Sequence, residues 1–465
     1  MFADTSKKRG PDARDEPRSL TALDWLNTMV DEMLLGTART AAPAPPETMP
    51  VPFAQTLPAV FPVLHGAGRE FDGDVLDRVV LGYAPMVDRR GAVMSTRLTV
   101  VPMNPHSAID ASTLLRTIGK AWPEHGGAVS LNVGSKTLLE DLLRAAPATN
   151  VMIEVPALIA GDARNIDVLL ELTRRGNTLL LKGRPASELP REVLQCFRWS
   201  IIDVDEDRRA GRAAAPQGVH RQMGFVQAGV KTMAQFKQSI DQGAVAVLGW
   251  PLNESAVEGG ARFDLEVIVE VINRIDRRES IESVERAMVR DPVLAFELMR
   301  HANERNVGLP VETASFRHAI MMVGYQELRR WLAHMLGSSG DESFLQPANY
   351  GALRRGLFMR ELGPDASDEE TLGELFMCGV FSLLDRMLGR PLDQLLASLV
   401  APERTRQALC EGRGPFMPML GMARAVESGS PDEIRSAAQA LYLKPAEVNQ
   451  ALICALAMGR QLSGA

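Results

Sequence analysis

Hydrophobic and polar positions divide the chain into three parts. From about residue 77 to residue 253, short apolar runs alternate with stretches of helical periodicity. From Phe263 onward, apolar residues recur at helical spacing and the short runs largely disappear. The pattern therefore predicts an N-terminal extension over residues 1–74, an α/β domain over residues 75–255 and an all-α domain over residues 260–465.

Seven apolar runs in the middle part are predicted to be buried strands: Val79–Val87, Ala128–Asn132, Val151–Glu154, Thr178–Leu181, Ser200–Val204, Gly224–Gln227 and Val245–Gly249. Helices are predicted between some of them, over Leu114–Ala121, Leu138–Ala145, Asn165–Thr173 and Met233–Gln242. Strands separated by helices favour parallel pairing through right-handed crossovers, and so many units predict a closed or nearly closed α/β barrel. An open, doubly wound sheet is the alternative.

The last part is predicted to be entirely helical. Asp291 and Pro292 form a helix start, because Asp caps a helix and Pro fits its first turn. A second helix is predicted to begin at Thr313 or Ser315 and to end before Gly324. The remaining helices are predicted over Val293–Asn303, Gln326–Leu336, Leu372–Leu388, Leu392–Leu399, Pro402–Leu409, Met417–Glu427, Pro431–Ala440 and Pro445–Met458.

The N-terminal extension contains one predicted amphipathic helix, Leu20–Leu35, followed by a proline-rich linker from Pro43 to Pro62. The helix has two open interpretations, docking on its own domain or binding a partner.

Composition narrows the function classes. Apolar residues make up 46% of the chain and charged residues 23%, as in ordinary globular proteins. A net charge of −7 gives no clustered surplus of Lys and Arg, so nucleic acid is not an expected partner. No apolar run approaches the roughly 20 residues that span a bilayer, and the sequence predicts a cytoplasmic protein without membrane insertion.

Strings in the middle part resemble the EAL family of cyclic di-GMP phosphodiesterases. Tyr83–Asp88, with the turn at Gly91, is similar to that family's first strand. Later strings match its second, third, late and final strands in order: Ser130–Val133, Ile153–Val155, Gly224–Thr232 and Val247–Leu252. The fold that the resemblance implies is a (β/α) barrel, in agreement with the periodicity.

Strings in the last part resemble the HDOD domain, a helical relative of the HD phosphohydrolases that generally lacks their metal chemistry. The matching strings are Val289–Leu294, Gly308–Val311, Ser315–Ile320, Val323–Leu332 and Cys378–Asp385. The resemblance thus implies a tandem protein in which an EAL-type barrel precedes an HDOD domain.

The resemblance also implies which residues stand at the EAL metal site. In that family, carboxylates and an Asn hold divalent cations that activate water and neutralise the phosphate. Asn132 and Glu154 match two of these ligands, and Asp205 matches an Asp. Thr96 or Arg97 stands where the name-giving Glu belongs.

Other family positions have also lost their acidic residues. Where the family has a pair of Asp residues, this chain has Lys182, Gly183 and Arg184. The family's catalytic Lys is missing, and the late motif ends in Lys231 instead of a Glu. We therefore expect a degenerate EAL-type barrel with no metal site, no cofactor and no enzymatic activity.

The expected function is a non-catalytic signal-transduction scaffold or regulator that acts through protein–protein contacts of both domains. The alternative is a sensor that binds cyclic di-GMP or another anion without turnover, and an active hydrolase is the third class considered. The sensor depends on a basic barrel mouth, which Arg97, Lys182, Arg184 and Lys231 would form. The same four residues could instead be solvated surface charges.

The expected partners are signalling proteins such as a kinase, a response regulator or a cyclic di-GMP enzyme, which the HDOD resemblance implies. The candidate partner face is the segment that carries Tyr325, Arg329, Arg330 and Trp331, since Trp, Tyr and Arg dominate interface hot spots. Trp331 could also serve simply as a core residue.

Overall fold

The computed structural model of the chain describes most residues after the N-terminal extension. The described ranges are 72–105, 107–122, 127–185, 188–206, 223–252, 263–305, 315–338, 346–364 and 367–463. The predicted helix Leu20–Leu35 lies outside them. The described residues all belong to one compact unit.

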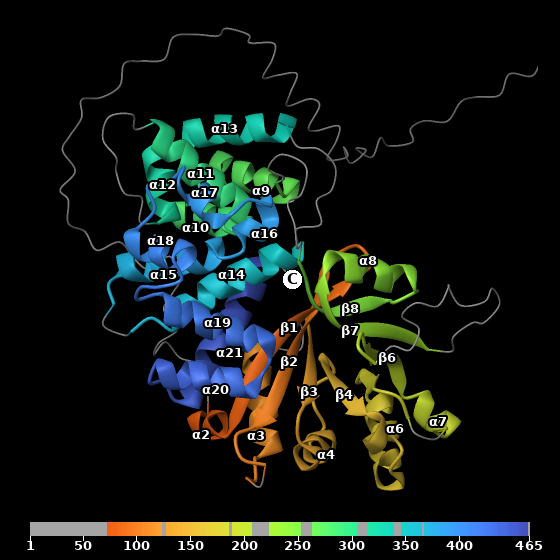
Figure 1. Cartoon of the computed structure of the whole chain (residues 1–465). Helices are drawn as coiled ribbons and strands as arrows, with labels where there is room; N and C mark the ends of the chain where they lie inside the picture. The colour runs from red at the N-terminus through yellow and green to blue at the C-terminus, as the bar shows by residue number, and fades with distance from the viewer. Residues whose placement is uncertain are drawn as a thin grey trace, which may run out of the picture. The chain divides into compact units, whose positions relative to one another are not determined.

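Eight strands form a closed barrel in chain order, which confirms the predicted barrel and removes the open-sheet alternative (Figure 1). Their bounds are β1 Val79–Asp88, β2 Val93–Pro102, β3 Ala128–Val133, β4 Val151–Pro156, β5 Leu179–Lys182, β6 Phe197–Asp203, β7 Gly224–Thr232 and β8 Ala246–Leu252. Neighbours from β2 to β8 are parallel, whereas β1 runs antiparallel to both β2 and β8.

Strand β2 is a strand that the periodicity did not predict. Three consecutive polar residues, Ser95, Thr96 and Arg97, and then Thr99 interrupt its apolar positions, so the run does not read as uniformly buried. A tight turn joins β1 to β2. The Asp88 side chain accepts hydrogen bonds from the Arg90 and Ala92 backbone N–H groups, which fixes the hairpin and reverses the chain direction.

Helices cover the outside of the barrel, the first of them before β1 and the others after parallel strands. They are α2 Gly73–Asp77, α3 Ala111–Ala121, α4 Lys136–Arg144, α5 Ala157–Ala160, the 3-10 helix η1 Ala163–Asn165, α6 Ile166–Arg174, α7 Arg191–Leu194 and α8 Met233–Asp241. Side-chain caps fix several starts. Asp110 caps α3, Ser135 caps α4, and Thr232 forms a capping box with Gln235 at α8.

The C-terminal half of the described chain is helical, as predicted. Its elements are α9 Leu265–Asp276, α10 Ile281–Met288, α11 Pro292–Arg305, α12 Phe316–Val323, α13 Tyr325–Ser338, α14 Gln346–Glu361, α15 Glu369–Phe381, α16 Leu384–Leu388, α17 Leu392–Leu396, α18 Glu403–Cys410, α19 Met417–Ser428, α20 Pro431–Ala440 and α21 Pro445–Ser463. Ser315 caps α12, and Gly324 ends it with a positive φ of 76°. None of the helices among the described residues combines the length and the apolar character that a membrane span requires.

Two helices of the C-terminal half, α10 and α14, were not predicted. Helix α14 is buried almost throughout, yet it carries Arg354, Arg355, Arg360 and Glu361 on its inward surfaces. Buried polar residues of this kind hide the apolar periodicity by which a helix is recognised.

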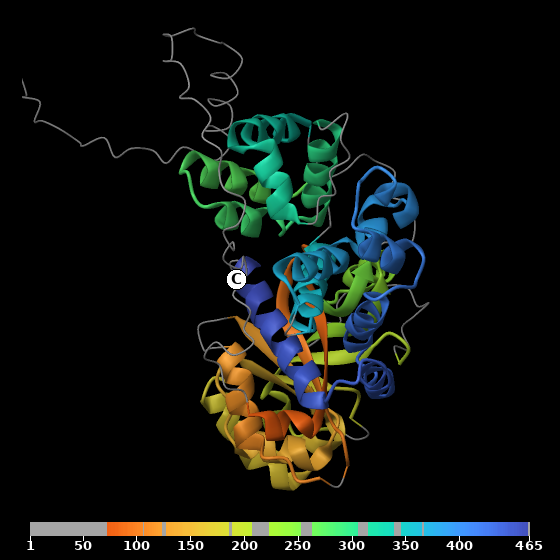
Figure 2. The same cartoon turned by 90° about the vertical axis from the view of Figure 1, so that its left-hand side faces the viewer.

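The β1–β2 hairpin leaves one wall of the barrel without a crossover helix, and helices from the far end of the chain cover it. Helices α19, α20 and α21 pack on β1, and α14 packs on β2 and β8. Figure 2 shows α21 lying along this wall. The approach is closest at Gly82 of β1, where an added Cβ would stand 2.8 Å from the Gly429 Cα at the end of α19.

Glu427 of α19 joins three elements at this wall. Its carboxylate accepts two hydrogen bonds from Arg355 of α14, at 2.7 and 2.6 Å, and one from the Tyr83 hydroxyl of β1 at 3.3 Å. Its backbone carbonyl accepts a hydrogen bond from the Trp250 indole of β8 at 3.2 Å. The Trp250 ring also meets Tyr83 edge to face, with centroids 5.5 Å apart. The barrel and the helices are therefore packed through shared buried polar groups.

Asn449 of α21 provides a second fixed link to the barrel. Its side-chain oxygen accepts from the Leu81 backbone N–H at 3.1 Å, and its amide donates to the Leu76 and Val79 carbonyls, both at 2.8 Å. Asn449 is only 2% exposed, so no water can replace these bonds.

We expect Asn449→Ala to lower the free energy of unfolding by about 3 kcal/mol, because it leaves one backbone donor and two carbonyls buried without partners. Urea unfolding followed by circular dichroism measures the loss. The control is Gln439→Ala, which changes an exposed side chain of α20 and should change stability by less than about 0.5 kcal/mol. Equal small effects of both substitutions would contradict the assigned role of Asn449.

Asp291, predicted as a helix cap, is a fully buried carboxylate that ties two helix starts together. One oxygen accepts from the Val293 and Leu294 N–H groups at the start of α11, and the other accepts from the Asp264 N–H before α9 at 2.7 Å. Burial raises the pKa of Asp291 to about 6, although the hydrogen bonds to backbone N–H groups oppose this shift.

This raised pKa makes stability depend on pH in a defined direction. Between about pH 4 and pH 6 the unfolded chain ionises Asp291 while the folded protein keeps it protonated, so stability falls as the pH rises. Relative to Asp291→Asn, the wild-type free energy of unfolding should drop by roughly 3 kcal/mol across this window, the value for a pKa change of this size. Denaturant unfolding at several pH values measures it. Parallel pH profiles for the two proteins would contradict the assignment.

Candidate functional site

An arginine and a glutamate pair inside the barrel at two positions where the EAL resemblance places metal ligands. Arg97 of β2 donates from Nε and Nη2 to the two carboxylate oxygens of Glu154 on β4, at 2.7 and 2.5 Å. The Ser130 hydroxyl of β3 adds a bond of 3.2 Å to Glu154. The Glu154 side chain is fully buried and that of Arg97 is 17% exposed, so the arginine lies on the solvent side of the pair.

A second cation pairs with a second ligand position. Lys182, the last residue of β5, donates from Nζ to the Asn132 side-chain oxygen of β3 at 2.7 Å, and the Asn132 amide donates to Thr99 of β2 at 3.2 Å. Burial, and then the neighbouring Arg97 charge, lower the pKa of Lys182 below its ordinary value. Arg97, Ser130, Asn132, Glu154 and Lys182 are called the barrel cluster below.

The barrel cluster does not fit a two-cation site. Both oxygens of Glu154 are engaged by Arg97, and the Asn132 oxygen accepts from Lys182. A divalent cation at either position would have to displace a fixed positive charge, and the ligands would supply too little negative charge to compensate. Over the described residues, no group of three or more His, Cys, Asp or Glu side chains is arranged to hold a metal ion.

The remaining predicted barrel residues are exposed. Asp205 lies in an exposed turn after β6, and it is Asp203, the last residue of β6, whose charge acts on Lys182. Arg184 lies exposed after β5, and Lys231 is an exposed residue of β7. Asp203 was missed by sequence reasoning. The signal was its place directly after the apolar pair Ile201 and Ile202, at the carboxyl end of a strand.

The predicted partner face on α13 mostly makes contacts within its own domain. The Tyr325 hydroxyl donates to the Glu279 carbonyl at 2.9 Å, and Arg329 pairs with Asp276 of α9 at 2.7 Å. Trp331 stacks on His301, whereas Arg330 is exposed and pairs with Glu327 on its own helix. Partner binding through this helix stays a prediction.

Comparison with known proteins identifies the helical part. Residues 265–387 match the sequence model of the HDOD domain. Over 331 residues the chain is 22% identical to the cyclic di-GMP phosphodiesterase CdgJ of Vibrio cholerae. The matched region covers 70% of this chain and 76% of that protein. Over 215 residues it is 23% identical to the uncharacterized protein YuxH of Bacillus subtilis, covering 45% of this chain and 52% of that one.

Two of the solved structures that resemble part of this chain are a response regulator and an EAL protein. The match with the MmoQ response regulator of Methylococcus capsulatus covers 42% of this chain and 99% of the MmoQ chain, at 16% identity and a TM-score of 0.37. A standalone EAL protein from Vibrio cholerae, solved with cyclic di-GMP bound, covers 40% of this chain and 93% of its own, at 14% identity and a TM-score of 0.28.

These comparisons correct one expectation and confirm another. The expectation of a non-catalytic scaffold, or of a sensor without turnover, is contradicted because the relative CdgJ is named a cyclic di-GMP phosphodiesterase. The predicted tandem architecture is confirmed by the closed barrel and the matched helical domain. Residues 265–387 match the HDOD domain, and they follow a closed eight-stranded barrel.

Proposed function

We propose that the chain hydrolyses cyclic di-GMP at the carboxyl ends of its barrel strands. The observation that carries the proposal is the relationship to CdgJ, which extends over 76% of that phosphodiesterase. The barrel cluster supports it, because Asn132 and Lys182 lie near strand ends where barrels of this type keep their active sites.

The cations of the barrel cluster would neutralise the phosphate. After pairing with Glu154, Arg97 retains Nη1, which has no acceptor among the described residues. Lys182 likewise uses one of its three ammonium hydrogens, on Asn132. Arg and Lys side chains are the common protein ligands of phosphate oxygens, so the charge that metal ions supply in other phosphodiesterases would come from these two residues.

Asp203 and Lys182 would move the protons. A water oxygen forms the bond to phosphorus, its proton passes to the Asp203 carboxylate, and the bond from phosphorus to a ribose oxygen breaks. The leaving oxygen takes a proton from the Lys182 ammonium, whose lowered pKa makes it the better donor. Register places Asp203 two residues beyond Ile201, the β6 partner of Lys182.

The purified full chain should convert cyclic di-GMP to a linear dinucleotide, and the conversion should persist in excess EDTA because no step uses a metal ion. Chromatography of the nucleotides over time, with EDTA, Mg²⁺ or Mn²⁺ in parallel, measures it. Turnover that requires added metal would overturn the roles given to Arg97 and Lys182 but leave hydrolysis intact. No turnover under any of these conditions would overturn hydrolysis itself.

Asp203→Asn and Lys182→Met should each lower kcat by about 100-fold, the usual loss for a missing proton-transfer group. The matched controls are Asp241→Asn and Lys237→Met on α8, both exposed and outside the barrel cluster, which should retain full activity. Thermal unfolding of all four variants separates lost chemistry from lost fold. Full activity in either barrel variant would remove that residue from the mechanism.

A further inference from the structure

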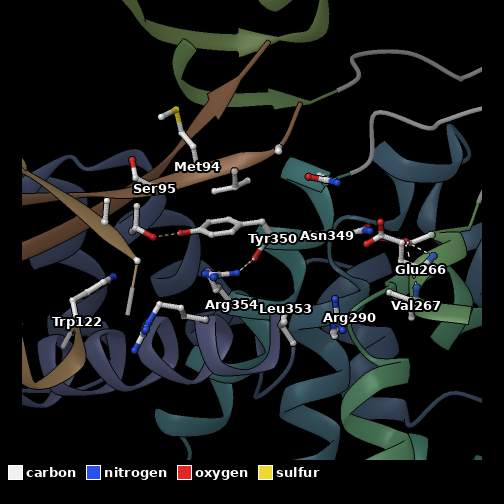
Figure 3. Close-up of a pocket in the computed structure, with 18 residues that line it drawn as sticks. Met94, Ser95, Trp122, Glu266, Val267, Arg290, Asn349, Tyr350, Leu353 and Arg354 are labelled. Carbon is white, nitrogen blue, oxygen red and sulfur yellow. Dashed lines mark hydrogen bonds between the residues drawn. The ribbon is translucent and has the colours of Figure 1, made fainter. Parts of the chain in front are cut away.

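A cavity of about 300 Å³ lies between the barrel and the helical domain, and no residue of the barrel cluster lines it. Its barrel side is formed by the amino ends of β2 and β3, whereas Asn132 and Lys182 lie near the carboxyl ends of their strands. Its helical side is formed by α14 and by residues at the start of α9 (Figure 3). This volume lies at the lower end of the range for small-molecule sites.

Arg354 of α14 is the main charged group of this cavity. It is 4% exposed, and its guanidinium carbon lies 3.4 Å from the centroid of the Tyr350 ring. One nitrogen donates to the Tyr350 carbonyl at 3.3 Å, as Figure 3 shows. Among the described residues Arg354 has no carboxylate partner, and its Nε has no acceptor. The stacking on the Tyr350 ring and the single long hydrogen bond leave most of the five guanidinium N–H groups of Arg354 without an acceptor in the ranges that the structure describes.

Other polar groups of the wall are also without partners in the described part of the chain. Asn349, one turn before Arg354, has an unpaired buried side-chain oxygen, and the Ser95 hydroxyl of β2 is buried without a partner. The Ser95 hydroxyl can donate to an oxyanion, and the Asn349 oxygen can accept from a hydroxyl group of the same ligand, such as that of a protonated phosphate. The Thr96 hydroxyl, by contrast, is bonded to the Tyr350 hydroxyl at 2.7 Å and so fixes that ring.

The charges around the cavity favour an anion. Arg290 lines the cavity and pairs with Glu270, while Asp264 uses its carboxylate to cap α9. Glu266 is exposed, so neither acidic residue of the wall compensates Arg354. An unpaired buried guanidinium is costly, and a bound oxyanion would remove that cost.

From this geometry we propose that the cavity is a binding site for a small ligand with a carboxylate or phosphate group, held by Arg354 with Asn349 and Ser95. An occupant contacts β2 of the barrel together with α14 and α9. Arg97 of the barrel cluster lies on β2, two residues from Ser95. The site therefore links ligand binding at the helical domain to a strand of the barrel, independently of the proposed hydrolysis.

Titration of the full chain with inorganic phosphate and, separately, with acetate tests the proposal and distinguishes the two chemistries. Calorimetry should show saturable binding of at least one, and the midpoint of thermal unfolding should rise with its concentration. Sodium chloride at equal ionic strength is the reference. Arg354→Met should lower the affinity at least tenfold, whereas Arg330→Met, which removes an exposed arginine, should leave it unchanged.

Asn349→Leu is the second variant, because Arg354→Met removes a buried group and could impair folding. It keeps the charge and removes the buried amide oxygen, and it should weaken phosphate binding several-fold with a cooperative unfolding transition retained. Absence of saturable binding to the wild-type chain would overturn the proposal. Binding that is unchanged in Asn349→Leu, or in a folded Arg354→Met protein, would place the anion elsewhere and overturn it too.

Discussion

The contact on which the rest of the structure depends is the packing of α19, α20 and α21 against the β1–β2 wall. A (β/α) barrel normally covers each strand with the helix that follows it, but the hairpin between β1 and β2 leaves no such helix. The apolar outer face of β1 would otherwise meet water. Glu427 and Asn449 make the cover specific, because each satisfies polar groups that the packing buries. The barrel and the helices consequently form one compact unit.

The barrel cluster shows how buried charges of opposite sign are paired inside the barrel. Glu154 and Asn132, which the EAL resemblance matches to two metal ligands, have Arg97 and Lys182 as their partners. A buried carboxylate without a cation would be strongly destabilising, so the charge that a metal ion would supply is supplied by the chain itself. Charge compensation, more than residue identity, is what the interior of the barrel requires.

Sequence patterns predicted most of the fold and part of the site. Long apolar runs such as Val79–Val87 marked strands correctly, because both faces of a barrel strand are buried. Strand β2 and helix α14 were missed because their buried polar residues are satisfied by partners distant in sequence, as Arg355 is by Glu427. The antiparallel direction of β1 depends on a turn at Asp88 that periodicity does not encode. The pairing of Arg97 with Glu154 was also beyond pattern reasoning, since it joins strands 57 residues apart.

The distance along the chain between β1 and α21 has a consequence for synthesis. Leu81 and Asn449 are bonded across 368 positions. At roughly 5 to 20 residues per second, the ribosome takes about 20 to 70 seconds to make the segment between them. During that interval β1 has emerged but the helices that cover it do not yet exist. The nascent barrel therefore exposes an apolar wall for tens of seconds, which makes it a substrate for chaperones that bind such surfaces until translation reaches α21.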